Sequence, residues 1–275
     1  MGKRESYVEQ LKSVQDWEAF LKKHSGLPGP RGNLELAQAA ADAGSKRQFK
    51  EWLRYDEASA PVNTQGEFVA FCGVVGYGRL LAEGETSALQ LLRKWASDGR
   101  WRLREAVAMA MQRYGERDMD GMLTAAEDWA RGTPLEQRAA AAAVCEPRLL
   151  SKPAYARRVL RMLDRITGSM ARAEDRRSEE CRALRQGLGY CWSVAIVALP
   201  EVGKPMLEKW AESGDPDVQW VVRENLKKAR LLRVDRRWAV ALQARLAGSK
   251  PTDAARIVRT GAEAGGRGDR RTSKA

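Results

Sequence analysis

The chain has 275 residues, of which 44 % are hydrophobic and 31 % charged, an ordinary balance for a globular protein. Its single histidine, His24, excludes His-based catalytic triads, and its four cysteines are too widely spaced to indicate a Cys/His zinc site. No apolar run is long enough to span a bilayer, and the N-terminus lacks the apolar core of a signal peptide. We therefore expect a cytoplasmic protein with no metal, cofactor or membrane partner.

The formal net charge of +12 is concentrated in the C-terminal half. Residues 157–185 hold nine arginines against five acids, and residues 223–237 hold seven basic residues against two acids. Residues 248–275 hold another seven basic residues against three acids, and they lack apolar periodicity. Because local concentrations of Lys and Arg attract polyanions, these segments indicate an acidic partner such as nucleic acid. The last segment is predicted to be a disordered basic tail.

Residues that favour helix dominate the chain, and alternating strand patterns are scarce, so the sequence predicts an all-α fold. In the N-terminal part, short Gly/Pro/Asp breaks separate four expected helices, 5–24, 33–43, 46–55 and 65–82. The fourth contains three glycines, at positions 73, 76 and 78. Glycine inside a helix costs about 1 kcal/mol relative to alanine, so these glycines favour close approach of a neighbouring helix.

Further along the chain, the expected helices come in pairs of roughly 30–40 residues, the length of a repeat in helical arrays. They are 86–96 with 100–114, 119–130 with 133–145, 155–171 with 176–199, and 205–212 with 217–231, followed by 235–246. Gly187 and Gly189 predict a break or kink in the helix 176–199. A broken helix offers a pocket at Tyr190 to Ser193, whereas a kink only fits a buried helix into its surroundings.

A sequence repeat supports this pairing. The segment 98–105, Asp-x-x-Trp-x-Leu-Arg-Glu, returns at 217–224 as Asp-x-x-Trp-x-Val-Arg-Glu, and a weaker copy lies at 135–139. Each copy follows an expected helix with a tryptophan near its end. The chain is therefore expected to be built from repeated helical pairs.

These repeats resemble HEAT repeats, in which an acid and an arginine six positions apart recur in the second helix of each repeat. In that family the two residues form a hydrogen-bonded ladder between neighbouring repeats. Asp98 with Arg104 matches the spacing, and so does Asp217 with Arg223. In the middle copy Gly132 stands where the acid is expected, so the ladder is interrupted there.

The resemblance implies a right-handed α-solenoid over residues 1–247, with N-terminal helices in 1–64 and the clearest repeats in 65–247. HEAT arrays serve many roles, so the fold alone does not give the function. One branch of HEAT-like proteins, the bacterial DNA alkylation repair glycosylases, is similar in size, helical throughout and basic on its concave face. Its activity implies a carboxylate flanked by tryptophans, but no segment here matches that site residue by residue.

Three carboxylates near the repeated tryptophans are weak candidates for a catalytic group: Asp98, Glu105 and Asp217. A carboxylate in such a place stabilises the positive charge that develops on a sugar when its base leaves. The alternative interpretation is structural: the two aspartates are then helix N-caps or partners in the ladder.

Three tryptophans are candidates for stacking on bases: Trp101, Trp192 and Trp220. Tryptophan stacks on a base with little regard to sequence, because every base has a π-face. The competing interpretation is again structural, since a tryptophan at a repeat position commonly packs between repeats.

Nine basic residues are candidates for binding the phosphates of nucleic acid. The first group is Arg158, Arg161, Arg165, Arg172 and Arg176, and the second is Arg223, Lys227, Arg230 and Arg237. A group that lies along one helical face is suited to following a phosphate backbone. The alternative is a solvated face that nearby acids neutralise.

The sequence favours a protein that binds duplex DNA on a basic concave surface, with excision of alkylated bases as an enzymatic extension. The alternative is a scaffold that binds an acidic protein partner and catalyses nothing. The position of the basic residues separates these hypotheses. Basic residues along a groove favour DNA, and basic residues scattered on outer helices favour the scaffold.

Overall fold

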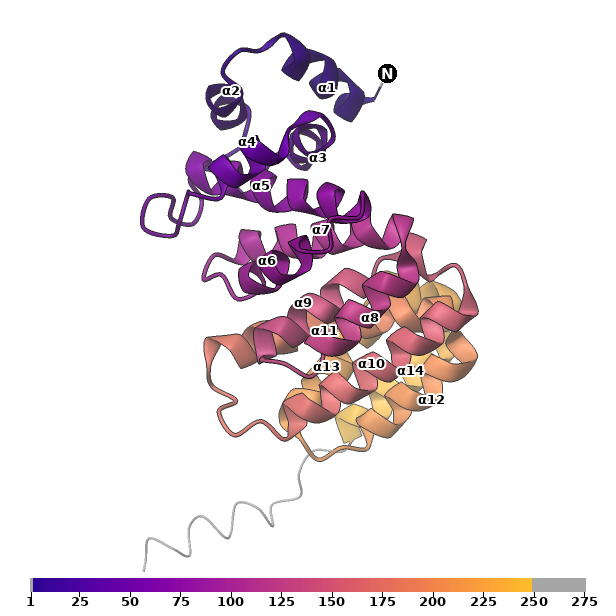
Figure 1. Ribbon diagram of the computed structural model, residues 1–275. Helices are drawn as coiled ribbons and strands as arrows, with labels where there is room; N and C mark the ends of the chain where they lie inside the picture. Colours follow the sequence, from indigo (N-terminus) through magenta and orange to yellow (C-terminus); the bar gives the residue numbers. More distant parts are fainter. Residues whose placement is uncertain (1, 249–275) are drawn as a thin grey trace, which may run out of the picture.

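Residues 2–248 are described by the structure, a computed structural model (Figure 1). Every regular element in this range is helical, and none of the described residues forms a strand, so the predicted all-α class is confirmed. The predicted basic tail, 248–275, lies outside the described residues except for Gly248, which ends the last helix. No helix within residues 2–248 combines the length and the apolar character that crossing a membrane requires.

The described chain forms α-helices and one short 3-10 helix, η1. The N-terminal helices are α1 (Lys3–Ser13), α2 (Trp17–Lys23), α3 (Leu34–Ala43), α4 (Lys46–Trp52), α5 (Gln65–Ala82), α6 (Ala88–Trp95) and α7 (Trp101–Arg117). They are followed by α8 (Met119–Trp129), α9 (Pro134–Val144), η1 (Pro147–Leu150), α10 (Pro153–Ala171), α11 (Glu179–Ala198), α12 (Pro200–Ala211), α13 (Pro216–Leu226) and α14 (Ala229–Gly248).

The helices pack in two layers. The odd-numbered helices from α1 to α13 contact one another in chain order, and the even-numbered helices from α4 to α14 pack against their odd-numbered neighbours. In Figure 1 the colour accordingly passes from indigo at the N-terminal end to orange and yellow at the other. The buried hydrophobic side chains form one continuous core between the layers. The free face of the odd-numbered layer carries the site described below.

The expected single helix 5–24 is in fact two helices, α1 and α2. The backbone is extended at Val14 (φ −86°, ψ 128°), which ends α1. The Asp16 carboxylate then accepts a hydrogen bond from Ala19 N (3.0 Å) and caps α2. α12 begins five residues before its predicted start, because Pro200 takes the first helical position, where its missing N–H is not needed.

The expected helix 217–231 is interrupted, because α13 ends at Leu226 and α14 begins at Ala229. α14 itself bends at Asp235, where the backbone leaves the helical region (φ −156°, ψ 90°). The Asp235 carboxylate accepts a hydrogen bond from Trp238 N (3.0 Å) and caps the helical segment that follows. The second group of basic residues therefore does not lie along one helix.

α11 is continuous, which excludes the break at Gly189 and leaves the alternative of a buried helix that accommodates its surroundings. This glycine makes room for a ring of the neighbouring helix, since a methyl group there would lie 3.0 Å from Trp220 Cζ3. Gly78 has the same use on α5, where a methyl group would overlap the backbone of Ala110 on α7. The close helix approach expected from the glycines of α5 is thus confirmed.

Candidate functional site

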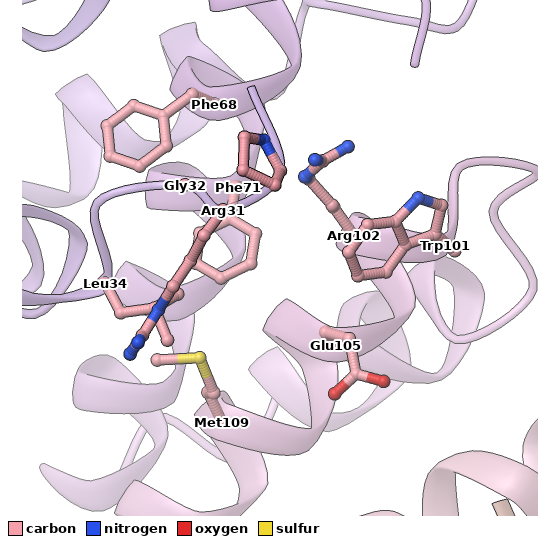
Figure 2. Close-up of a pocket in the computed structure, with 10 residues that line it drawn as sticks. Arg31, Gly32, Leu34, Phe68, Phe71, Trp101, Arg102, Glu105 and Met109 are labelled. Carbon is pink, nitrogen blue, oxygen red and sulfur yellow. The ribbon is translucent and has the colours of Figure 1, made fainter. Parts of the chain in front are cut away.

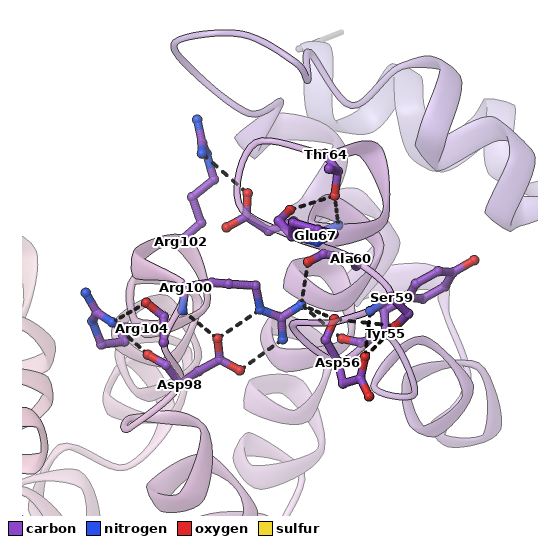
Figure 3. A network of polar contacts seen from close by, with 12 residues as sticks. Tyr55, Asp56, Ser59, Ala60, Thr64, Glu67, Asp98, Arg100, Arg102 and Arg104 are labelled. Carbon is purple, nitrogen blue, oxygen red and sulfur yellow. Dashed lines mark hydrogen bonds and ion pairs between the residues drawn. The ribbon is translucent and has the colours of Figure 1, made fainter.

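A buried arginine fixes the start of α7. Arg100 is fully buried, and its Nε and Nη2 atoms each donate to a carboxylate oxygen of Asp98 over 2.9 Å. Its Nη1 atom donates to the carbonyl oxygens of Tyr55 (3.0 Å), Asp56 (3.1 Å) and Ala60 (3.1 Å). Figure 3 shows how this one guanidinium joins the loop after α4 to the turn that begins α7. The orientation of α7 is therefore set from its first residue.

The acid–arginine ladder expected from the repeat is not formed in the predicted way. Arg104 Nη1 donates to the backbone oxygens of Asp98 (2.7 Å) and Gly99 (2.9 Å), because the Asp98 carboxylate is already held by Arg100. In the second copy, Asp217 pairs with Arg185 of α11 instead of the arginine six positions later. The repeated pairs are thus structural, but with other partners.

Two hollows lie on the odd-numbered face, one on each side of α7. The first, which we call the aromatic pocket, has a volume of about 240 Å³ and is mostly apolar (Figure 2). The Phe68 and Phe71 rings of α5 lie nearly parallel, 4° apart with centroids at 6.2 Å. Other lining residues are Pro30, Arg31, Gly32, Leu34, Trp101, Arg102, Glu105 and Met109.

Arg102 forms part of the wall of the aromatic pocket. Its guanidinium stacks on the Trp101 ring, with 4.4 Å from Cζ to the ring centroid. It donates from Nη1 to Glu67 Oε2 (3.3 Å) and from Nη2 to Gly29 O (3.0 Å), whereas its buried Nε has no partner within residues 2–248. Glu67 is fully buried, and this burial raises the pKa of its carboxyl group despite the hydrogen bond from Asn63 N and the charge of Arg102.

The second hollow, which we call the polar groove, has a volume of about 550 Å³ and lies between α7, α9 and α11. It shares Trp101, Glu105 and Met109 with the aromatic pocket. Because these residues are four positions apart on α7, they stand on one helical face, and we call them the α7 ridge. The remaining lining residues are Arg104, Ala108, Gln112, Arg138, Ala142, Cys145, Glu146, Ala183, Gln186, Gly187, Tyr190 and Cys191.

Glu105 is the carboxylate at the centre of this surface. It is paired with Arg138 Nη2 from α9, and Arg138 Nη1 donates to the backbone oxygen of Arg104 (3.1 Å). The Glu105 side chain keeps 45 % of its surface exposed, so the pair holds the carboxylate in place without covering it. Burial, followed by the neighbouring charge of Arg138, lowers the pKa of Arg104.

The other two candidate carboxylates do not line either hollow. Asp98 is 13 % exposed and is gripped by Arg100 on both oxygens. Asp217, in the first turn of α13, is 24 % exposed and paired with Arg185. Their structural interpretation is therefore the better one, and Glu105 alone of the three faces a space that can hold a ligand.

The three candidate tryptophans differ in exposure. Trp101 is 46 % exposed on the α7 ridge and is available for stacking. Trp220 is partly buried against α11, with the Arg185 guanidinium 4.8 Å from its ring centroid. Trp192 is fully buried, and its Nε1 donates to Thr167 Oγ1 (3.0 Å). The prediction that Trp192 stacks on a base is wrong, because its ring belongs to the core.

The first basic group is not one stripe and does not line either hollow. Arg158, Arg161 and Arg165 lie on α10, in the even-numbered layer, whereas the group's last two residues, Arg172 and Arg176, follow that helix. Arg158 is neutralised by two acids, Glu127 (3.0 Å) and Asp120 (2.9 Å), and Arg176 pairs with Asp215. Arg161 and Arg165 have no partner among the described residues, and with Arg131 they line a shallow hollow of about 160 Å³.

The second basic group is likewise divided by the turn between α13 and α14. Arg223 donates to Gln219 (3.3 Å) on α13, and Lys227 is paired with Glu224. Arg230 begins α14 and lies 4.4 Å above the Tyr190 ring, whose hydroxyl accepts its hydrogen bond over 2.6 Å. Arg237 comes after the bend of α14.

Of the arginines that line the hollows, Arg104 and Arg138 stand at the arginine position of the repeat, whereas Arg31 and Arg102 were missed by the sequence patterns. Arg31 lies in an irregular loop between α2 and α3. Arg102 directly follows a repeated tryptophan, at a position that varies between the copies. Arg138 belongs to the weak middle copy, where the sequence leaves open a role in the ladder or a contact with phosphate. Its distance from Glu105 along the chain, one repeat, is the only signal that could have paired them.

No cluster of metal-binding side chains occurs within residues 2–248. Cys145 and Cys191 line the polar groove, but both are buried, and burial together with the neighbouring Cys191 raises the pKa of Cys145 well above its ordinary value. Cys145 is therefore a protonated thiol and a poor nucleophile. No protein-family model matches this chain, and no curated protein matches its sequence.

Proposed function

We propose that this protein is a HEAT-like, right-handed α-solenoid that binds duplex DNA on its odd-numbered face and excises damaged bases there. The chain-order packing of the odd-numbered helices supports the solenoid, because successive inner helices contact one another along the array. The polar groove, bounded by three successive inner helices, supports a long ligand that runs across the repeats. The cytoplasmic location expected from the sequence suits this function.

The observation that carries the enzymatic part is the position of Glu105. It is a partly exposed carboxylate on the ridge between two hollows, one turn after an exposed tryptophan and fixed by Arg138. When the bond between sugar C1′ and the base nitrogen breaks, its electrons leave with the base and positive charge develops on the sugar. A fixed carboxylate beside C1′ stabilises that charge, and water then adds to C1′ and releases one proton to the solvent.

Alkylated bases are the substrates that this arrangement suits. A base carrying an extra alkyl group on a ring nitrogen is cationic and leaves readily without a general acid. Burial raises the pKa of Cys145 and makes its thiol a weak acid, and the single histidine lines neither hollow. Trp101 supplies a flat surface for a base, and base–aromatic stacking is worth about 1–3 kcal/mol.

A second candidate function, binding of an acidic protein partner, is favoured by the position of the basic residues, because none of the nine predicted phosphate-binding residues lines the aromatic pocket or the polar groove. Arg131, Arg161 and Arg165 have no partners among the described residues and lie in the even-numbered layer or beside it, away from the polar groove. Three unpaired guanidinium groups around one hollow, whose lining also holds Arg158 paired with Glu127, suit an acidic side chain or a phosphate. This surface does not use Glu105 or Trp101, so the two functions can be tested apart.

Binding is tested by fluorescence anisotropy of the full chain with a random-sequence duplex and with a duplex that contains N7-methylguanine. Arg138→Met, with Arg47→Met as a matched control on the exposed surface of α4, separates groove contacts from general charge. We expect Arg138→Met to weaken binding and Arg47→Met to leave it unchanged. Affinity should fall by about tenfold or more between 50 and 200 mM salt. Equal loss in both variants would contradict binding in the groove.

Excision is tested by measuring free base released from the methylated duplex. Glu105→Gln keeps the size of the side chain and removes its charge, so we expect it to bind the duplex but release base about a hundredfold more slowly. Asp217→Asn is the control, because its carboxylate lies outside both hollows. If the unsubstituted protein binds but releases no base, the enzymatic part of the proposal fails and DNA binding stands.

A further inference from the structure

The aromatic pocket has features that binding and excision in the polar groove do not require. Its inner wall is made of the parallel Phe68 and Phe71 rings, and Trp101 stands at its mouth (Figure 2). Its lining is mostly apolar, and its volume of about 240 Å³ is far smaller than that of the polar groove. Such a space suits a flat, compact ring better than a strand or a peptide.

Two arginines add polar groups to this apolar space. Arg31 is exposed at the mouth of the pocket, and its guanidinium has no partner within residues 2–248. Arg102 is only 7 % exposed, and its Nε is a buried donor with no acceptor in the described chain. The guanidinium of Arg102 is already bonded to Glu67 and Gly29, so Arg31 is the lining cation that remains available to an anionic ligand.

We propose that the aromatic pocket binds a planar, purine-sized heterocycle, and that Arg31 neutralises the phosphate attached to it. Trp101, which is 46 % exposed, provides a face for stacking, and the buried Phe68 and Phe71 rings and the guanidinium of Arg102 complete the wall around the ligand. The pocket has aromatic faces but only one carboxylate, Glu105, at its edge. This balance favours a nucleotide, with a flat ring and an anionic group, over an aliphatic ligand.

The ring can come from two sources. One is a nucleotide rotated out of a duplex that lies in the polar groove, and this source rests on the proposed function. Because the α7 ridge borders both hollows, such a nucleotide would pass over Trp101 and Glu105 to enter the pocket. The other source is a free nucleotide, which requires no DNA in the groove.

The free source is tested with 2-aminopurine deoxyribonucleoside monophosphate, a fluorescent purine nucleotide that is quenched when it stacks on aromatic rings. We expect saturable quenching by the full chain. Leu34→Trp should abolish it by filling the pocket, and Arg31→Ala should weaken it by about tenfold or less through loss of the phosphate contact. Arg47→Ala is the matched control, being exposed and outside the pocket.

Entry of a nucleotide rotated out of the duplex is tested by permanganate oxidation of the thymine opposite a purine in a bound duplex. A thymine that has lost its partner reacts faster. We expect protein binding to raise this reactivity, and Leu34→Trp to prevent the rise while the anisotropy of the duplex still reports binding. Duplex binding without a pocket-dependent rise excludes eversion but leaves the proposed function intact. If the protein binds no duplex at all, the proposed function fails. The quenching of the free nucleotide then decides by itself whether the aromatic pocket binds a ligand.

The proposal is overturned if two measurements are the same for Leu34→Trp, Arg31→Ala and the unsubstituted protein: the quenching of the free nucleotide and the reactivity of the thymine. Arg31→Ala keeps this test decisive even if Leu34→Trp fails to fold, because Arg31 is exposed and makes no contact that the fold needs. Thermal unfolding of each variant shows whether it is folded at the temperature of the assay.

Discussion

Arg100 folds back onto Asp98, two residues earlier, and holds both carboxylate oxygens at 2.9 Å while it donates to three carbonyl oxygens of the 55–60 loop. All of this occurs at a side chain with no exposed surface. A buried guanidinium is stable only when its donors are satisfied, and here Asp98 and the 55–60 loop accept five hydrogen bonds from it (Figure 3). The pair is therefore a joint between the loop after α4 and α7.

Replacing Arg100 should destabilise the protein strongly. Arg100→Met leaves the Asp98 carboxylate and three carbonyl oxygens without their donor, and breaking a buried pair in this way costs about 3–5 kcal/mol. Urea unfolding followed by circular dichroism measures the change. Arg131→Met is the control, since Arg131 is exposed and has no side-chain partner in the described chain, and it should change stability by less than about 0.5 kcal/mol. Equal effects of the two substitutions on stability would show that Arg100 does not hold the loop after α4 and α7 together.

Truncation should lower stability far more at Trp192, the most buried of the candidate tryptophans, than at Trp101, the most exposed. Trp192→Ala removes a fully buried ring and its bond to Thr167, so it should lower the free energy of unfolding by about 3–5 kcal/mol. Trp101→Ala removes a ring that is 46 % exposed, so it should lower stability by less than about 1 kcal/mol. The same variant should weaken DNA binding by about fivefold or more through lost stacking. Urea denaturation measures the stability of both variants, and anisotropy measures their DNA binding. A larger loss of stability in Trp101→Ala than in Trp192→Ala would contradict the prediction.

A methyl group at Gly78 should separate α5 from α7. Although alanine favours helix by about 1 kcal/mol over glycine, the added carbon would overlap the backbone of Ala110, which cannot move aside as a side chain can. We expect Gly78→Ala to lower the melting temperature. Gly214→Ala is the matched control, because nothing lies within 4 Å of the added carbon, and its melting temperature should be unchanged or higher. A gain in stability from Gly78→Ala would show that the helices do not approach as closely as described.

Asp42 should make stability depend on pH. Burial raises the pKa of Asp42, but hydrogen bonds from Arg4 (2.6 Å) and Arg113 (2.6 Å) outweigh it and hold the pKa below its ordinary value. A depressed pKa stabilises the folded state above the unfolded value of about 3.9, and this contribution is lost as the pH falls through the folded pKa. Asp42→Asn should therefore cost about 1–2 kcal/mol at pH 7.

At a pH well below the folded pKa of Asp42, the same substitution should cost little, because the carboxyl group is then protonated in both states. Urea unfolding of both proteins across pH 2.5–7 gives the difference directly. A constant difference over this range would mean that Asp42 acts through packing rather than through its charge. Glu35→Gln, at an exposed position on the same helix, controls for general acid effects.

The helices could be predicted from the sequence because propensity and breaks act locally. The predictions of helix ends and breaks failed where a second interaction outweighed the local pattern. At residue 16 a capping aspartate overrides a continuous apolar stripe, and at Gly189 the glycine admits a ring from a different helix instead of breaking its own. Neither outcome can be read from the local pattern, since the first depends on cap energy and the second on tertiary contact.

The candidate site was predicted only in part for the same reason. Glu105 and Trp101 were visible as repeated residues, and both lie on the α7 ridge. The repeat could not show that Asp98 is taken by Arg100, because the competing donor lies outside the matching positions. Spacing along α10 placed Arg158 and Arg161 on one face correctly, but it could not show that this helix belongs to the even-numbered layer.

The shared wall at Trp101, Glu105 and Met109 links the aromatic pocket and the polar groove thermodynamically. Any ligand that reorients Trp101 in one hollow changes the shape of the other, so the free energy of filling one depends on whether the other is filled. By reciprocity the effect is equal in both directions. If both hollows hold ligands, the orientation of this one indole ring decides whether the two ligands favour or oppose each other.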